Sequence, residues 1–132
     1  MRKIILRFGI VMLIIAEAGV VCYPMSVKKE PMPKELIAKS VFGKKGTELG
    51  EFENLFSLAI KGNYLFVADS GNSRIQVLEI KSDGNLTPKF SFGKRGKGKG
   101  EFIYPFGLVT KDNYLYVADT GNNRIQGLEI KY

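Results

Sequence analysis

The chain has 132 residues, enough for one domain, and its apolar fraction of 45% is ordinary for a globular protein. The formal net charge is +7, but residues 1–34 hold six Lys or Arg against two Glu, so the remainder is only mildly basic and the charge alone does not indicate a nucleic-acid ligand. The absence of histidine excludes an imidazole base or metal ligand, and a single cysteine, Cys22, excludes an internal disulfide.

Residues 1–22 have the layout of a secretory signal peptide. Three cations lie among the first seven residues, an apolar run follows at 8–16, and a small-x-small sequence at 16–18 is typical of a processing site. The run is shorter than the roughly 20 apolar residues that a membrane span needs. A cleaved signal is therefore favoured, with a retained membrane anchor as the alternative. In both cases the leader contacts the membrane during export, and the protein is expected to be extracytoplasmic, either secreted or anchored.

Cys22 also raises the hypothesis of lipidation after cleavage. A lipoprotein signal normally has a small residue directly before the cysteine, and Val21 fits this poorly, so we favour an ordinary apolar residue near the processing site. Residues 23–35 contain three prolines and mixed charge, which predicts an extended linker.

The rest of the chain is a duplicated block. Residues 63–81 return fifty positions later at 113–131, and a gapless comparison of 42–81 with 92–131 gives 25 identical residues in 40. A repeat of this length fixes the architecture, so it takes priority over any local motif.

Each unit predicts short strands joined by tight turns. The second strand, YLFVA or YLYVA, is apolar on both faces and must be covered on both faces. Residues 37–42 match the last strand of the first unit and are expected to form an extra outer strand. The other strands are expected at 56–61, 64–68, 74–81 and 88–92 in the first unit, and at 106–111, 114–118 and 124–131 in the second.

Four short antiparallel strands with a covered inner strand describe one blade of a β-propeller. The predicted fold is all-β, with two four-stranded antiparallel blades that form an arc of a propeller. The repeat domain is placed at 36–132, divided at about 42–91 and 92–132.

The segment FGKRGKGKGEFIYPFGLVTKDNYLYVADTGNNRIQ (92–126) and its counterpart at 42–76 resemble the NHL-repeat family of six-bladed β-propellers. The first unit departs from the family pattern at Leu55 and Ser57, where the second has the usual Pro105 and Gly107. Related propeller enzymes hold a metal in the central channel with His and carboxylates. This chain has no His, so we predict a non-catalytic protein with no catalytic residue, no metal site and no cofactor. A subunit of a calcium-dependent hydrolase or lyase, with its site formed across chains, is the alternative.

Two blades do not close a ring, because propellers have 4 to 8 blades and fewer than three repeats rarely bury their own faces. One explanation is assembly, in which residues 37–42 pair with the last strand of a neighbouring chain and a homotrimer closes six blades. The other is that the chain is a fragment of a longer propeller. Either arrangement predicts a large exposed apolar patch on an isolated two-blade arc.

Two polar sets are candidate sites. The first occurs identically in both units and suits a structural turn lock better than a ligand site: Asp69, Asn72, Arg74, Asp119, Asn122 and Arg124. The second lies among the glycines of residues 93–100 and is a candidate anion-binding loop, weighed against an ordinary solvated loop: Lys94, Arg95, Lys97 and Lys99. We predict an exported module that binds protein partners or itself, and not nucleic acid, since no aromatic-plus-basic pattern supports stacking on bases.

Overall fold

The computed structural model describes residues 4–8, 11–16, 19–24 and 30–132, in two compact units, Met1–Ile37 and Ala38–Tyr132. In the first unit, strands β1 (Ile4–Phe8), β2 (Val11–Ala16) and β3 (Gly19–Pro24) form an antiparallel sheet in that order. Positions 17 and 18 of the predicted processing site and residues 25–29 of the predicted linker lie outside the described residues. Within the described residues, no helix has the length and hydropathy of a membrane span.

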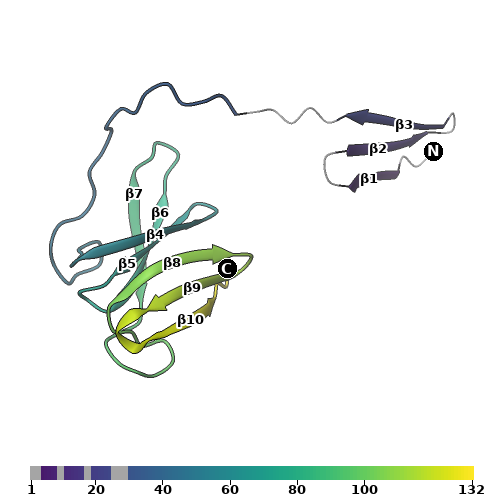
Figure 1. The fold of residues 1–132 in the computed structure, drawn as a ribbon. Helices are drawn as coiled ribbons and strands as arrows, with labels where there is room; N and C mark the ends of the chain where they lie inside the picture. The colour runs from purple at the N-terminus through teal and green to yellow at the C-terminus, as the bar shows by residue number, and fades with distance from the viewer. Residues whose placement is uncertain (1–3, 9–10, 17–18, 25–29) are drawn as a thin grey trace. The chain divides into compact units, whose positions relative to one another are not determined.

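The second unit contains two antiparallel sheets, shown in Figure 1, and the predicted all-β fold is confirmed. The first sheet has the order β4-β5-β6-β7, and the second has the order β8-β9-β10. We call them the first and second blades. The strands are β4 (Leu55–Lys61), β5 (Tyr64–Asp69), β6 (Arg74–Ile80), β7 (Leu86–Phe92), β8 (Pro105–Lys111), β9 (Tyr114–Asp119) and β10 (Arg124–Glu129), with a 3-10 turn, η1 (Thr120–Asn122), before β10.

The two blades have the same strand register. Asp69 lies opposite Arg74, and Asp119 lies opposite Arg124. The turn between the second and third strands therefore joins equivalent residues in both blades. A β-bulge follows the first residue of both β4 and β8. Bulges bend and twist a strand locally, and their repetition gives both blades the same curvature at the same place.

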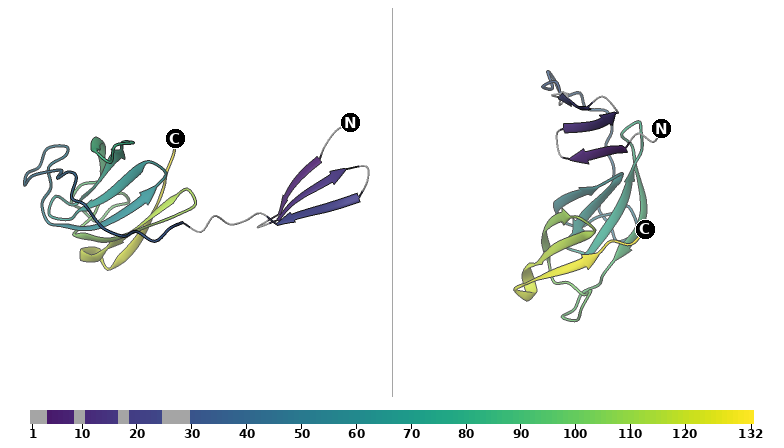
Figure 2. Two further views of the ribbon diagram at one scale, coloured as in Figure 1. Left: turned by 90° about the horizontal axis from the view of Figure 1, so that it is seen from above. Right: turned by 90° about the vertical axis from the view of Figure 1, so that its right-hand side faces the viewer.

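The blades pack face against face, as Figure 2 shows. Phe66, Ala68 and Ile75 of the first blade form one apolar cluster with Leu115 and Val117 of the second blade. The opposite face of the first blade is covered by Phe52, which comes from the loop at 43–54 and packs on Leu65, Val67 and Leu78. The expectation that β5 is covered on both faces is therefore confirmed.

The loop before each blade places an aromatic ring in the core. Phe102 is fully buried between the blades, and its ring lies directly under Gly93. Gly93 has a φ of +94°, and a Cβ there would come within 2.5 Å of the Phe102 ring, so the position requires glycine both conformationally and sterically. Gly43 repeats this arrangement over Phe52.

One strand prediction is wrong. Residues 37–42 are exposed and have no regular secondary structure. The physical reason lies in the partner strand: β7 is held by the outer edge of β6, whereas residues 37–42 have no third strand of an earlier blade to pair with among the residues that the structure describes. An isolated segment without a pairing edge does not form a strand.

Candidate functional site

Asp69 is the centre of a closed hydrogen-bond network. Its carboxylate accepts the Glu53 amide at 2.8 Å, Arg74 Nε at 2.7 Å, and the side-chain amides of Asn72 and Gln76 at 3.0 Å each. The carboxylate is completely buried. Its capacity as an acceptor is therefore used within the blade, and no free oxygen is presented to a ligand.

The donors around Asp69 also hold the loop that precedes the blade. Arg74 Nη2 donates to the carbonyls of Glu48 and Glu51, and Gln76 Nε2 donates to the Glu51 carbonyl at 2.6 Å. Asn72 donates to the Gly46 carbonyl at 2.9 Å. We call Asp69, Asn72, Arg74 and Gln76, with their counterparts in the second blade, the blade lock. The glutamine was not singled out from the sequence, although its recurrence at Gln76 and Gln126 beside Arg was the available signal.

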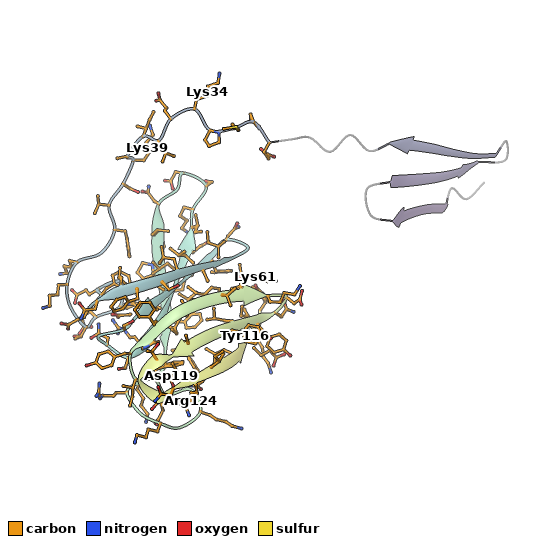
Figure 3. The ribbon with its side chains drawn as sticks, in the orientation of Figure 1. Lys34, Lys39, Lys61, Tyr116, Asp119 and Arg124 are labelled. Atoms are coloured by element: carbon orange, nitrogen blue, oxygen red, sulfur yellow. The ribbon has the colours of Figure 1, made fainter. Side chains whose placement is uncertain are left out.

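The second blade repeats this arrangement, and Figure 3 shows Asp119 and Arg124 side by side. Asp119 accepts the Ile103 amide at 2.8 Å, Arg124 Nε at 2.8 Å, Asn122 at 2.9 Å and Gln126 at 3.1 Å. Two copies with equivalent partners indicate a part made once per blade, and the geometry gives this set a structural role.

Acidification should weaken the second lock. Burial alone would raise the pKa of Asp119, but the hydrogen bonds from Ile103, Asn122, Arg124 and Gln126 together hold it below its ordinary value of 3.8. Because the folded-state pKa is the lower one, this stabilisation is complete above the unfolded-state pKa of about 3.9 and is lost as the pH falls through the folded-state pKa. We expect the thermal midpoint to be nearly constant from neutral pH to about pH 5 and to fall below about pH 4.

The check is a thermal melt across pH for the wild type and for Asp119→Asn. The variant should start lower and fall less steeply in acid, because it lacks the titrating carboxylate. Part of the fall will persist, since the pKa values of Glu51, Glu79, Asp83 and Glu101 are also lowered by hydrogen bonds. Parallel curves for the two proteins would contradict this account.

The glycine-rich loop at 93–100 uses three of its glycine amides internally. The Gly96 amide donates to the Phe102 carbonyl, the Gly98 amide to the Glu101 carboxylate at 2.9 Å, and the Gly100 amide to Gln126 Oε1 at 2.9 Å. These are the groups that an anion cradle would need. The amides of these three glycines are therefore not available to an anion in this arrangement.

Three of the four cations of this loop have different neighbours. Lys94 pairs with Glu101 at 3.4 Å, and the Arg95 guanidinium lies 5.6 Å from the centre of the Tyr104 ring. The Lys97 carbonyl accepts from Arg124, and Lys99 lines a groove beside β10. The described residues contain no group of three or more carboxylate or cysteine side chains placed to hold a metal ion.

The most distinctive surface is the free face of the second blade, which we call the open face: Val109, Tyr114, Tyr116 and Ile125. Ile125 is 75% exposed, whereas Ile75, its equivalent in the first blade, is 1% exposed because the second blade covers it. Tyr116 is 39% exposed and its equivalent Phe66 only 6%. The predicted exposed apolar patch is therefore confirmed on this blade.

A groove adjoins the open face. It has a volume of about 830 Å³ and lies between β10 and the outer part of the first blade, with Phe90 and Phe92 on one side and residues 124–131 on the other. Sequence reasoning did not find this groove, because its walls come from blades that are separate in the chain. The open face and the groove are adjacent apolar features without an internal role, so they form the candidate functional site of residues 30–132.

Comparison with known proteins supports the repeat. Two segments, residues 56–78 and 107–124, match the LVIVD repeat, a β-propeller-type repeat. They fall within β4 to β6 and within β8 to the start of β10, at equivalent places in the two blades. No curated protein matches the chain. The chain thus carries two copies of a β-propeller-type repeat, folded as two blades, and this is a coarser assignment than the NHL family that the sequence resembles.

Proposed function

We propose that this chain is an exported, non-catalytic protein of the NHL type that acts by protein association through its open face, with a second copy of itself as the partner. The observation that carries the proposal is the contrast between Ile75 and Ile125. The same side chain at the same register is buried in the first blade, against the second, and exposed on the second blade.

The first blade has a complementary surface. Its face opposite the second blade carries Leu58 and Ile60, both more than half exposed, beside the Phe52 cluster. This face is the structural equivalent of the one with which the second blade packs on the first, since Leu58 and Leu108 occupy matching registers. The first blade of one copy and the open face of another can therefore reproduce the internal contact.

Several internal contacts would recur at such an interface. Phe56 stacks on Phe106 with ring centres 4.4 Å apart, and the Ser70 hydroxyl donates to the Pro105 carbonyl across the blade junction. Between copies, Phe106 would meet Phe56 of the partner subunit, and the Thr120 hydroxyl would take the place of Ser70. A head-to-tail contact of this kind closes into a ring when its rotation allows, and three copies would give the six blades expected from the resemblance.

Export remains part of the proposal. It is supported by the basic, apolar and small-x-small sequence of the leader. The intact mass of the protein recovered from its natural host reports directly on the removal of residues 1–22.

We expect the wild-type chain to run as an oligomer on a size-exclusion column with light scattering, and Ile125→Lys to run as a monomer. Ile125 is exposed, so a lysine there is tolerated by the isolated fold, but a docked blade would leave its charge buried without a partner. The matched control is Met32→Lys, which adds the same charge on the exposed segment before the blades. A wild-type chain that stays monomeric at every concentration tested would contradict the proposal.

A further inference from the structure

The second blade lacks a strand that the first blade has. In the first blade β7 pairs with the outer edge of β6, with Phe92 opposite Ile75 and Phe90 opposite Val77. In the second blade β10 is the outermost strand (Figure 1), and within the described residues nothing pairs with its outer edge. A free edge with exposed apolar side chains, such as Ile125, is a template for pairing with another chain.

The groove is the place that this strand would occupy. Its walls combine the side of the first blade that faces the second, including Ile75, Phe90 and Phe92, with the whole length of β10. A strand lying in it would have backbone partners on β10 on one side and apolar side chains of the first blade against one face. That is the same surrounding that a fourth strand has in a propeller blade.

The chain contains a segment that matches the missing strand. Residues 36–42, LIAKSVF, precede the first blade at the position where residues 86–92, LTPKFSF, precede the second. The two share Leu, Lys and Phe at the first, fourth and seventh positions. Leu36 is 95% exposed and Val41 is 99% exposed, so apolar side chains of this segment are unburied in the isolated chain.

The end of the segment is already held as the end of β7 is. Phe42 meets Phe52 edge to face at 6.3 Å and 68°, and Phe92 meets Phe102 at 6.3 Å and 67°. Phe52 covers the face of the first blade that points away from the second blade. Phe42 therefore lies on the face of the first blade opposite to the groove, and the groove is left for the segment of another copy.

We propose that residues 36–42 of one copy form the fourth strand of the second blade of another copy, in the groove beside β10. This inference rests on the proposed self-association and specifies the contact that makes it. The register of β6 and β7 carries over, so that Phe42 of the partner subunit lies opposite Ile125, Ser40 opposite Gly127 and Ala38 opposite Leu128.

Charge follows the same register. In the first blade Lys89 of β7 pairs with Glu79 at 3.0 Å, and Glu79 also pairs with Lys81. In the second blade Glu129 pairs with Lys131 at 3.3 Å and is half exposed. The donated strand brings Lys39 to Glu129 in the position that Lys89 has toward Glu79. Lys39 lies on the exposed segment outside both blades (Figure 3).

The donated strand adds to the apolar surface that association buries. Val109, Ile125, Leu58 and Ile60 are each more than half exposed, and docking of the blade faces covers them. The strand adds burial of Leu36, Ile37 and Val41 and backbone pairing along β10, which offset the entropic cost of association.

The first test is a proline pair in the full chain, Ser40→Pro with Val41→Pro. Neighbouring residues of a strand point their amides to opposite sides, so one of the two prolines must remove an amide that faces β10, whichever residue it is. The segment is irregular and exposed, so the thermal midpoint of the monomer should not change. We expect light scattering to show monomer for the double variant and oligomer for the wild type.

The matched control is Ala38→Pro, because position 38 corresponds to Pro88, a natural proline at the irregular point of β7. This variant should assemble like the wild type. An oligomer that persists in the double variant but is lost in Ile125→Lys would overturn strand donation and leave self-association standing. A monomeric wild type would overturn both.

The second test is a cross-link. Ser40→Cys with Gly127→Cys places two thiols at a predicted cross-strand pair, where Cα atoms lie about 4.5–5.5 Å apart, within the range that a disulfide spans. We expect oxidation of the double variant to give covalent species up to the size of the native oligomer. The two single variants, which show any linkage through Cys22, should not form these species. A doubly substituted oligomer that forms no such link would overturn the register proposed.

Discussion

Asp69→Ala should remove about 3–5 kcal/mol from the free energy of unfolding, the cost of breaking a buried pair by removing one partner. The substitution leaves Arg74, Gln76, Asn72 and the Glu53 amide directed at a space with no acceptor. These are also the groups that fasten the preceding loop. Since a domain is typically stable by 5–15 kcal/mol, the loss is a large part of the total.

Urea denaturation at fixed protein concentration measures this effect. Asp83→Ala is the control, because Asp83 lies in an exposed turn and bonds only Asn85. Asp119→Ala should cost less than Asp69→Ala, since the side chain of Arg124 is 32% exposed and that of Arg74 only 14%, so water can replace more of the lost contact in the second blade. If the Asp69→Ala protein has the same free energy of unfolding as Asp83→Ala, the blade lock does not stabilise the fold.

Phe102→Ala is the second substitution with a large expected effect, about 3–5 kcal/mol of lost stability. Phe102 is fully buried in the cluster that joins the two blades, so its removal opens a cavity at their junction. The substitution should lower the urea midpoint with little change in the slope, because the surface exposed on unfolding is almost unchanged.

Phe52→Ala is the matched variant. Phe52 occupies the same place before the first blade, but its cluster is bounded by the unoccupied face of that blade, where side chains can close over the gap. We expect a smaller loss for Phe52→Ala in the monomer. If the chain assembles as proposed, the difference should narrow in the oligomer, where a partner covers that face. Equal losses in the monomeric chains would contradict the unequal packing of the two rings.

The strands of the second unit were largely predictable, because hairpin turns and apolar runs are local signals. The extents of β4 to β10 agree with prediction to within a few residues. Residues 37–42 were the exception: their sequence is that of an outer strand, yet strand formation depends on an edge that only another blade can provide. The sequence of residues 37–42 therefore predicts a strand, but the segment is irregular because no neighbouring strand in the described part of the chain pairs with it.

The candidate site was less predictable for a related reason. The polar residues that were most conspicuous in the repeat are Asp69 and Asn72 with their counterparts. Their hydrogen-bonding groups are occupied by contacts within the blade, so they are not free to bind a ligand. The groove has no sequence signature of its own, since Phe90 and Ile125 become neighbours only when the blades pack. Gln76 was overlooked because nothing in its local context shows that it spans 25 residues to the Glu51 carbonyl.

The blade lock has a consequence for how such a protein can change in length. Every hydrogen bond of the first lock joins residues between Gly46 and Gln76, and every bond of the second joins residues between Gly96 and Gln126. A duplication of one fifty-residue unit therefore copies a complete set of donors and acceptors and leaves none unmatched. Addition or loss of whole units thus leaves the hydrogen bonds of each remaining blade lock intact, and its cost falls on the apolar faces at the two ends of the array.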